Sequence, residues 1–209
     1  MSSAKRIWNL CAPFYDSFMG RNQKAYKQMY DNIRLAIKGK RVLELCTGTG
    51  LIAKNVASEA KEMIATDFAE RMLQQAAKGD IPNNLSFRQV DASNIPFDDE
   101  SFDVVIVSNG LGIIPNAQSA LSEIARVLRS DGLLIAPNFL GSMADRKDKF
   151  RAKLLSWLGI KFKLSWDESS YPTFLENHGW EIKKKEIINA TPAIMYTECL
   201  KMAKDNPNV

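Results

Sequence analysis

The fold of this chain is decided by the stretch Val42-Leu43-Glu44-Leu45-Cys46-Thr47-Gly48-Thr49-Gly50. Residues typical of a β-strand are followed by two glycines that a single residue separates. A helical pattern begins immediately afterwards, at Leu51. Glycine lets a backbone turn approach a ligand closely, and the N-terminus of a helix that starts there presents free N–H groups. The stretch therefore predicts a nucleotide-type cofactor site at the end of the first strand of an α/β sheet.

The rest of the chain alternates strand and helix patterns, with Ser130-Asp131-Gly132 expected to turn the chain into the fifth strand. Such alternation predicts a doubly wound, mostly parallel sheet of the Rossmann-like kind. Two late strands after a helix predict an antiparallel C-terminal edge, which gives seven strands in all. The expected strands are 41–45, 62–66, 85–90, 102–108, 133–137, 181–189 and 193–201. The expected helices include 51–58, 69–78, 118–128 and 168–177, together with a run of apolar residues at helical spacing from Tyr26 to Ile37.

The totals are those of an ordinary globular protein. The 209 residues predict a single domain over 1–209, and the composition is 45% hydrophobic and 25% charged. No apolar run approaches the roughly 20 residues of a membrane span, and Pro13 interrupts the stretch that could resemble a signal peptide. Three cysteines without a close pair indicate reduced thiols in a cytoplasm, and a single histidine argues against a metal site.

The positive charge is concentrated in one segment. Residues 142–165 hold seven basic and two acidic side chains, which is a net charge of +5. The whole chain has a net charge of +4, so the remaining residues together carry −1. The apolar residues of the basic segment share a helical face and then alternate with lysines. Two interpretations stay open for this predicted flap over 140–168: a cover on the core with solvated lysines, or a cover that also contacts an anionic membrane surface.

The glycine pattern alone leaves two cofactors open, a nicotinamide dinucleotide and S-adenosylmethionine. Asp67 ends the second strand, where a carboxylate accepts hydrogen bonds from ribose hydroxyls of either cofactor. Glu44 lies inside the first strand, where an acid suits a cationic amino-acid group better than a pyrophosphate. Asp91 closes the third strand and suits an adenine amino group. No tyrosine is followed by lysine four residues later, so the pair that a short-chain reductase needs is missing.

Taken in order, these motifs resemble the class I S-adenosylmethionine-dependent methyltransferases, of methyltransferase type 11, and especially the ubiquinone/menaquinone C-methyltransferases. Cys46 stands where that family usually has its first glycine, and Val127-Leu128-Arg129-Ser130-Asp131-Gly132 resembles the family's turn before the fifth strand. The resemblance implies S-adenosyl-L-methionine as cofactor. The cofactor-binding residues that it implies are Glu44, Cys46, Thr47, Gly48, Gly50, Asp67, Phe68, Met72, Asp91, Ala92, Ser108 and Asn109.

The same resemblance gives a meaning to Ala12-Pro13-Phe14-Tyr15-Asp16. Relatives carry a similar element in an N-terminal lid, here expected over 1–38, and Tyr15 would cover the methionine end or face the acceptor. The alternative is a helix that uses its aromatic residues as core anchors. Tyr15 is therefore the one catalytic candidate. His178, before Gly179, is expected to lie at a helix C-terminus and not to act as a base.

The sequence says less about the methyl acceptor than about the cofactor. Ser108-Asn109-Gly110-Leu111 is not the signature of nucleic-acid amino methylation, so no nucleic-acid partner is expected. The resemblance and the apolar flap favour a small or lipid-like acceptor: a quinone precursor, a phospholipid amine or a thiol. The expected location is cytoplasmic, with peripheral membrane contact as the open second interpretation. An NAD(P)-dependent reductase and a non-catalytic cofactor-binding protein of the same fold remain the alternatives.

Overall fold

The computed structural model describes residues 3–16, 22–141 and 166–203, and its centre is a single mixed β-sheet. The strands are β1 (Arg41–Leu45), β2 (Glu62–Asp67), β3 (Leu85–Gln89), β4 (Phe102–Val107), β5 (Leu128–Ile135), β6 (Asn138–Phe139), β7 (Trp180–Ile188) and β8 (Ile194–Lys201). Their order is β3-β2-β1-β4-β5-β8, and both β6 and β7 pair with β8. The first five strands are parallel, and β8 is antiparallel to each of its neighbours. The predicted fold class is confirmed: the seven predicted strands are all present, and β6 adds only two residues beside β8.

The largest difference from a predicted strand boundary is at the start of β5. The residues Ser130-Asp131-Gly132 do not precede β5 but lie inside it, because the strand starts at Leu128. Phe102 pairs with Leu128, whereas Val104 pairs with Leu133, so extra residues bulge out of the β5 side of the ladder. Gly132 belongs to this bulge, where a Cβ would lie 2.8 Å from the side chain of Leu128. A turn-like composition is thus explained by a bulge within a strand.

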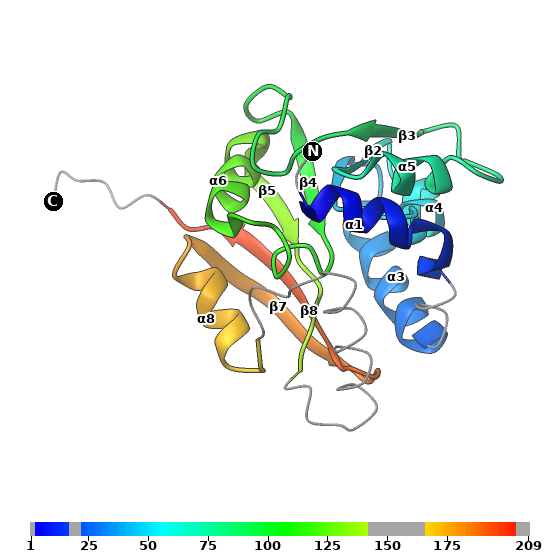
Figure 1. The fold of residues 1–209 in the computed structure, drawn as a ribbon. Helices are drawn as coiled ribbons and strands as arrows, with labels where there is room; N and C mark the ends of the chain where they lie inside the picture. The colour runs from blue at the N-terminus through cyan, green and yellow to red at the C-terminus, as the bar shows by residue number, and fades with distance from the viewer. Residues whose placement is uncertain (1–2, 17–21, 142–165, 204–209) are drawn as a thin grey trace, which may run out of the picture.

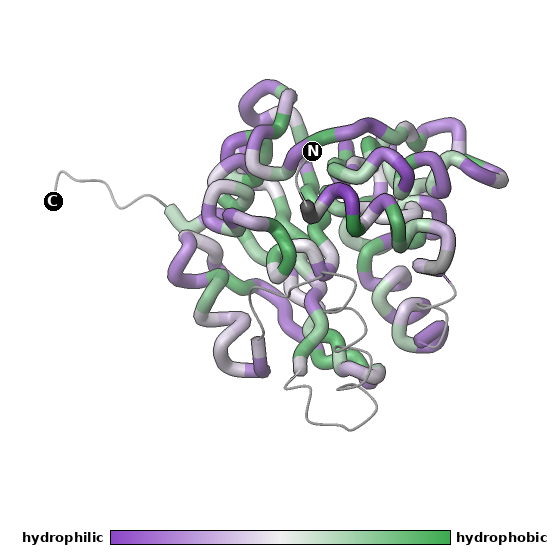
Figure 2. The backbone as a smooth tube through the Cα atoms, viewed as in Figure 1, coloured by the Kyte–Doolittle hydropathy of each residue, from purple (hydrophilic) through white to green (hydrophobic). Residues whose placement is uncertain are grey.

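Helices cover both faces of the sheet. In Figure 1, α6 (Ala117–Val127) and α8 (Ser170–Glu176) lie on one side, and α3 (Gln23–Ile37) and α4 (Leu51–Val56) lie on the other. The short helix η3 (Ala57–Glu59) extends α4. Each side of the sheet has its own hydrophobic core, and β1 contributes residues to both. Leu43 is buried towards α6 and α8, whereas Val42 is buried towards α3 and α4. Figure 2 shows the central strands in green and the outer loops mostly in purple.

The N-terminal region divides into two parts. Helix α3 packs on the sheet, whereas α1 (Ser3–Cys11) and the one-turn η1 (Ala12–Phe14) lie against α5 (Glu70–Ala76), as Figure 1 shows. We call residues 3–16 the lid segment. The predicted flap over 140–168 falls, except at its two ends, outside the described residues, and so does its predicted helix over 142–158.

A polar network joins α3 to the last hairpin of the sheet. Glu186 on β7 accepts hydrogen bonds from Gln28 and from Asn32, the latter at 2.9 Å, and Lys184 donates to Asn32 at 3.0 Å. At the N-terminus of α3, the side chain of Asn22 exchanges hydrogen bonds with the backbone of Thr191. These contacts span 152 to 169 residues of sequence.

Among the described residues, no helix has both the length and the apolar character that crossing a bilayer requires. His178 follows α8, as predicted, and its Nδ1 lies 2.6 Å from the carbonyl oxygen of Phe174. It therefore interacts with an unpaired carbonyl of the helix C-terminus.

Candidate cofactor site

The turn between β1 and α4, which we call the glycine turn (residues 46–50), requires its glycines. Gly48 and Gly50 have φ angles of 58° and 78°, in the left-handed region that side chains disfavour. A Cβ on Gly50 would lie 3.2 Å from both the Cβ of Ala76 and the ring of Phe87. The turn is tied to β2, because the Thr47 N–H donates to the Thr66 carbonyl at 2.8 Å. The backbone of the turn is therefore held in one shape, close against α5, β2 and β3.

Glu44 is a fully buried acid inside β1, with a side chain that is almost unexposed (1%). Its carboxylate accepts a hydrogen bond from the Thr47 hydroxyl at 2.7 Å and another from the Ala53 backbone N–H. Burial, and to a smaller extent the charge of the nearby Asp67, raise the pKa of Glu44 to about 7 against the opposing effect of the two hydrogen bonds. A cation brought next to this carboxylate would favour its ionised form, which suits the ammonium group of an amino acid.

Asp67 lies at the carboxyl end of β2, and it ties that end to the glycine turn. One carboxylate oxygen accepts the Gly48 N–H at 2.9 Å, and the other accepts the Ala69 N–H at 2.8 Å. Burial raises the pKa of Asp67, and the backbone hydrogen bonds partly counter that effect. Two of the three acids predicted for the cofactor, Glu44 and Asp67, therefore converge on one turn, at the carboxyl edge of the parallel strands.

Asp91 and Ala92 follow β3, as predicted, but their surroundings differ. The Asp91 side chain is exposed and accepts the Ser93 N–H at 2.9 Å, whereas Ala92 is buried. The loop after them is held by α6, because Arg126 donates to the carbonyls of Ile95 and Phe97, both at 2.8 Å. The sequence prediction missed Arg126; only its i,i+3 spacing from Glu123, its salt-bridge partner, could have marked it.

The loop after β4 meets the glycine turn from the other side. A Cβ on Gly110 would lie 3.0 Å from the Cys46 sulfur, so these two turns are in contact. Asn109 has a φ of 54°, and its side-chain oxygen accepts the Phe139 N–H at 2.7 Å, while Ser108 beside it is half-buried. Burial raises the pKa of the Cys46 thiol, which keeps it protonated and unreactive at neutral pH.

The lid segment reaches the same turn. The Tyr15 ring lies over Gly48, 3.6 Å from where a Cβ would be, and the Asp16 carboxylate accepts a short hydrogen bond from the Thr49 hydroxyl. Burial, followed by the charges of Asp67 and Asp16, raises the pKa of Tyr15, so its phenol stays protonated at neutral pH.

The two remaining predicted residues lie on the α5 side of the site. Phe68 is partly exposed, and the Lys5 ammonium group lies 5.2 Å from the centre of its ring. Met72 is buried in a small cluster with Ala12 and Ala69, against which Tyr15 packs. The structure thus gathers Tyr15, Glu44, Cys46, Thr47, Gly48, Gly50 and Asp67 around one turn. It places Asp91 and Ala92 on the adjoining loop after β3.

A glycine turn after β1, a buried acid before it, acids after β2 and β3, and an antiparallel last strand together define the class I S-adenosylmethionine-dependent methyltransferase fold. Comparison with known families agrees, since residues 43–136 match the model described as a methyltransferase domain. Residues 43–136 of this chain thus match a methyltransferase domain of the kind whose cofactor is S-adenosylmethionine.

Curated relatives act in quinone biosynthesis, as their names state. The chain is 35% identical over 106 residues to the demethylmenaquinone methyltransferase of Clavibacter sepedonicus. The aligned residues are 49% of this chain and 42% of that protein. The chain is also 35% identical over 162 residues to the ubiquinone/menaquinone biosynthesis C-methyltransferase of Paraburkholderia phymatum, covering 72% and 64%. The chain thus spans about half the length of the curated relatives that it matches.

A solved structure extends the likeness over nearly the whole chain. The complex of DhpI with S-adenosylhomocysteine has a TM-score of 0.76 and covers 97% of both chains at 18% identity. At that identity the likeness concerns the fold alone.

Proposed function

We propose that this protein binds S-adenosylmethionine at the glycine turn and transfers its methyl group to a ring carbon of a demethylated quinol. The observation that carries the cofactor half is the convergence of Glu44 and Asp67 on one turn, with Gly48 bonded to Asp67 at 2.9 Å and Thr47 bonded to Glu44 at 2.7 Å. The names of the relatives support the acceptor half.

The residues of the turn fit this cofactor. Asp67 offers a carboxylate to a vicinal diol, Glu44 offers one to an ammonium group, and Gly50 lets the turn pack closely against Ala76 of α5 and Phe87 of β3. When bound, S-adenosylmethionine supplies a methyl group on a positively charged sulfur. The task of the protein is then to align the acceptor with that carbon and to exclude water.

Tyr15 and Asp16 perform the covering part of this task. Tyr15 lies over Gly48, and its raised pKa makes the phenol a hydrogen-bond donor and not a base. The chain's one histidine, His178, interacts with a carbonyl at the end of α8. An acceptor that ionises readily by itself suits such a site, because it needs no strong base from the protein. A thiolate or a neutral amine meets that requirement most easily, so the support for a quinol acceptor is the names of the relatives.

The cofactor half is tested by calorimetry of the purified protein with S-adenosylhomocysteine and with NADH. Binding of the first and not of the second is expected, and the reverse result would overturn the proposal. The acceptor half is tested by S-adenosylhomocysteine release with a demethylated quinol, a phospholipid amine and an alkyl thiol. Turnover confined to the amine or to the thiol would contradict the quinol assignment.

We also propose that the basic, apolar segment 142–165 brings the protein to anionic membranes, where a lipid-like acceptor is found. Co-sedimentation with anionic vesicles at low and at high salt checks this. Binding that salt abolishes is expected, and no binding at either salt concentration would rule it out.

A further inference from the structure

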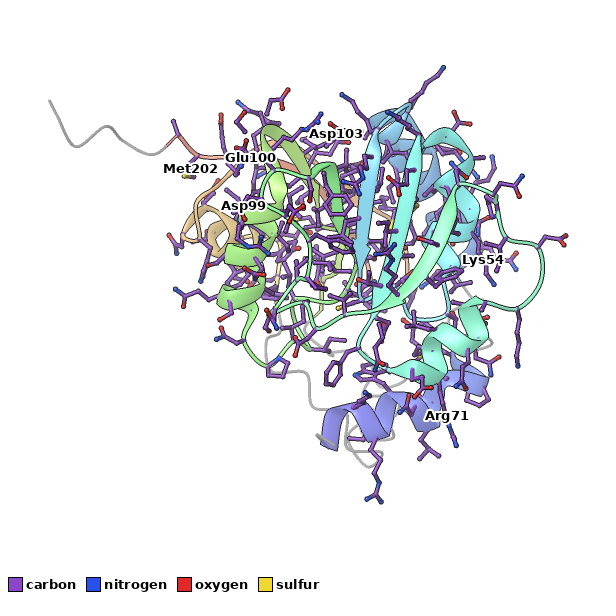
Figure 3. The ribbon with its side chains drawn as sticks, turned by 90° about the horizontal axis from the view of Figure 1, so that it is seen from above. Lys54, Arg71, Asp99, Glu100, Asp103 and Met202 are labelled. Carbon is purple, nitrogen blue, oxygen red and sulfur yellow. The ribbon has the colours of Figure 1, made fainter. Side chains whose placement is uncertain are left out.

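Helix α5 begins without a cap of its own. Its N-cap residue is Ala69, which has no side-chain acceptor, although a helix leaves its first N–H groups unpaired. The side chain of Asn9 fills this role from another helix: its oxygen accepts the Arg71 N–H at 2.9 Å, across 62 residues of sequence. Figure 3 shows the labelled Arg71 where α5 faces the N-terminal helix.

The same junction is apolar on its inner side. Met72 and Ala69 of the α5 region are buried with Ala12 of the lid segment, and Trp8 and Tyr15 pack against them. The rings of Trp8 and Tyr15 meet edge to face, with their centres 6.3 Å apart. The lid segment and the start of α5 are therefore packed as one unit, and Asn9 supplies a directional hydrogen bond between them.

The start of α5 is also the end of the loop that follows Asp67. The Asp67 carboxylate accepts the Ala69 N–H with one oxygen and the Gly48 N–H with the other. A continuous path of contacts thus runs from Asn9 through Arg71 and Ala69 to Asp67 and the glycine turn. A shift of the first turn of α5 would move Ala69, and with it one of the two groups that orient the Asp67 carboxylate.

We propose that Asn9 is a positioning residue of the cofactor site. By accepting the Arg71 N–H, it fixes the first turn of α5 against the lid segment, and this holds Asp67 at the glycine turn. The inference rests on the proposed function, because it assigns to Asn9 an effect on cofactor affinity. Asn9 acts through these residues, so its loss weakens binding without changing the chemical step.

Three variants of the full chain test this: Asn9→Ala, which removes the acceptor; Asn9→Asp, which keeps it; and Leu10→Ala, a control at the neighbouring exposed position. Calorimetry with S-adenosylhomocysteine is expected to give a Kd about threefold to tenfold higher for Asn9→Ala, as for the loss of a helix cap, and near the unmodified value for the other two. The KM for S-adenosylmethionine should rise by the same factor, while kcat stays within about twofold.

Hydrogen exchange provides a second measurement that does not depend on turnover. The Arg71 amide should exchange faster in Asn9→Ala than in Asn9→Asp, both without ligand and with S-adenosylhomocysteine. Unchanged affinity of Asn9→Ala, or equal losses in all three variants, would overturn the inference and leave the proposed function intact. Failure of the unmodified protein to bind S-adenosylhomocysteine would instead overturn the proposed function, and the inference with it.

Discussion

The glycine turn and the lid segment meet at Gly48, but they are held by different kinds of contact. The turn is tied down by buried groups of β1 and β2: Thr47 donates to Thr66, and the Thr66 hydroxyl donates to the Glu44 carbonyl at 2.8 Å. The lid segment is tied down by side chains that reach 33 and 62 residues along the chain, from Asp16 to Thr49 and from Asn9 to Arg71.

The glycine turn thus sets the shape of the cofactor site, whereas the lid segment covers it. Buried backbone hydrogen bonds are costly to break, so the turn keeps its form whether or not a ligand is present. Hydrogen bonds from partly exposed side chains can be replaced by bonds to water at a smaller cost. The lid segment can therefore be weakened without loss of the fold, whereas the turn cannot, and the expected effects of substitution fall in that order.

The largest effect is expected for Gly50→Ala, compared with Gly79→Ala as its control. Both glycines have a φ of 78°, but only Gly50 has neighbours that a Cβ would meet, at 3.2 Å. Both variants should lose about 1–2 kcal/mol of stability through backbone strain. Only Gly50→Ala should also lose S-adenosylhomocysteine affinity, by about 30-fold or more, as calorimetry would show. Equal affinity in the two variants would mean that the close approach at Gly50 has no role in binding.

Asp67→Ala should weaken S-adenosylhomocysteine binding by about tenfold, or about 1.4 kcal/mol, because one charge-assisted site is lost. Asp103→Asn is the matched control: Figure 3 shows Asp103 and Arg71 at opposite ends of the parallel strands, and Arg129 pairs with Asp103 at 2.8 Å. The control should bind as the unmodified protein does. Undiminished binding by Asp67→Ala would remove the main support for the ribose role of that residue.

Glu44 should make both stability and binding depend on pH. Its pKa, about 7 in the folded chain against 4.5 as its ordinary value, means that the unfolded chain releases the proton first. The Glu44 contribution to stability should therefore fall as pH rises from about 4.5 to 7, by up to about 3 kcal/mol, and Glu44→Gln should remove that contribution while leaving the one from Asp67, whose pKa is also raised. Cofactor affinity should rise over pH 6 to 8, since the ionised form holds the ammonium group. Denaturant titrations and calorimetry at several pH values measure both effects.

The smallest effect on activity is expected when the hydroxyl group of Tyr15 is removed. Tyr15→Phe should keep kcat within about twofold, because a phenol whose pKa is raised does not act as a base, whereas Tyr15→Ala should lower it about fivefold through loss of cover. Initial rates with the acceptor found in the release screen measure the difference. A large loss in Tyr15→Phe alone would assign the hydroxyl a direct catalytic role.

The two regions also differ in how far they could be predicted. The strand ends and the glycine turn follow from local patterns: β1 begins and ends at the predicted residues, and Asp67 ends β2. The contacts of Asn9, Asp16 and Arg126 did not follow, since periodicity shows which face of a helix is buried and not which distant N–H or carbonyl a side chain meets. The start of β5 was missed for a related reason, because a bulge and a turn share the composition Ser-Asp-Gly.

The network between α3 and β7 has a consequence for synthesis on the ribosome. Gln28 and Asn32 are translated early, but their partner Glu186 emerges more than 150 residues later, and the Thr191 backbone that Asn22 binds emerges later still. The polar side chains of α3 are therefore hydrated during synthesis, until the last hairpin leaves the exit tunnel and supplies their partners. The first helix that packs on the sheet is completed by almost the last strands to be made.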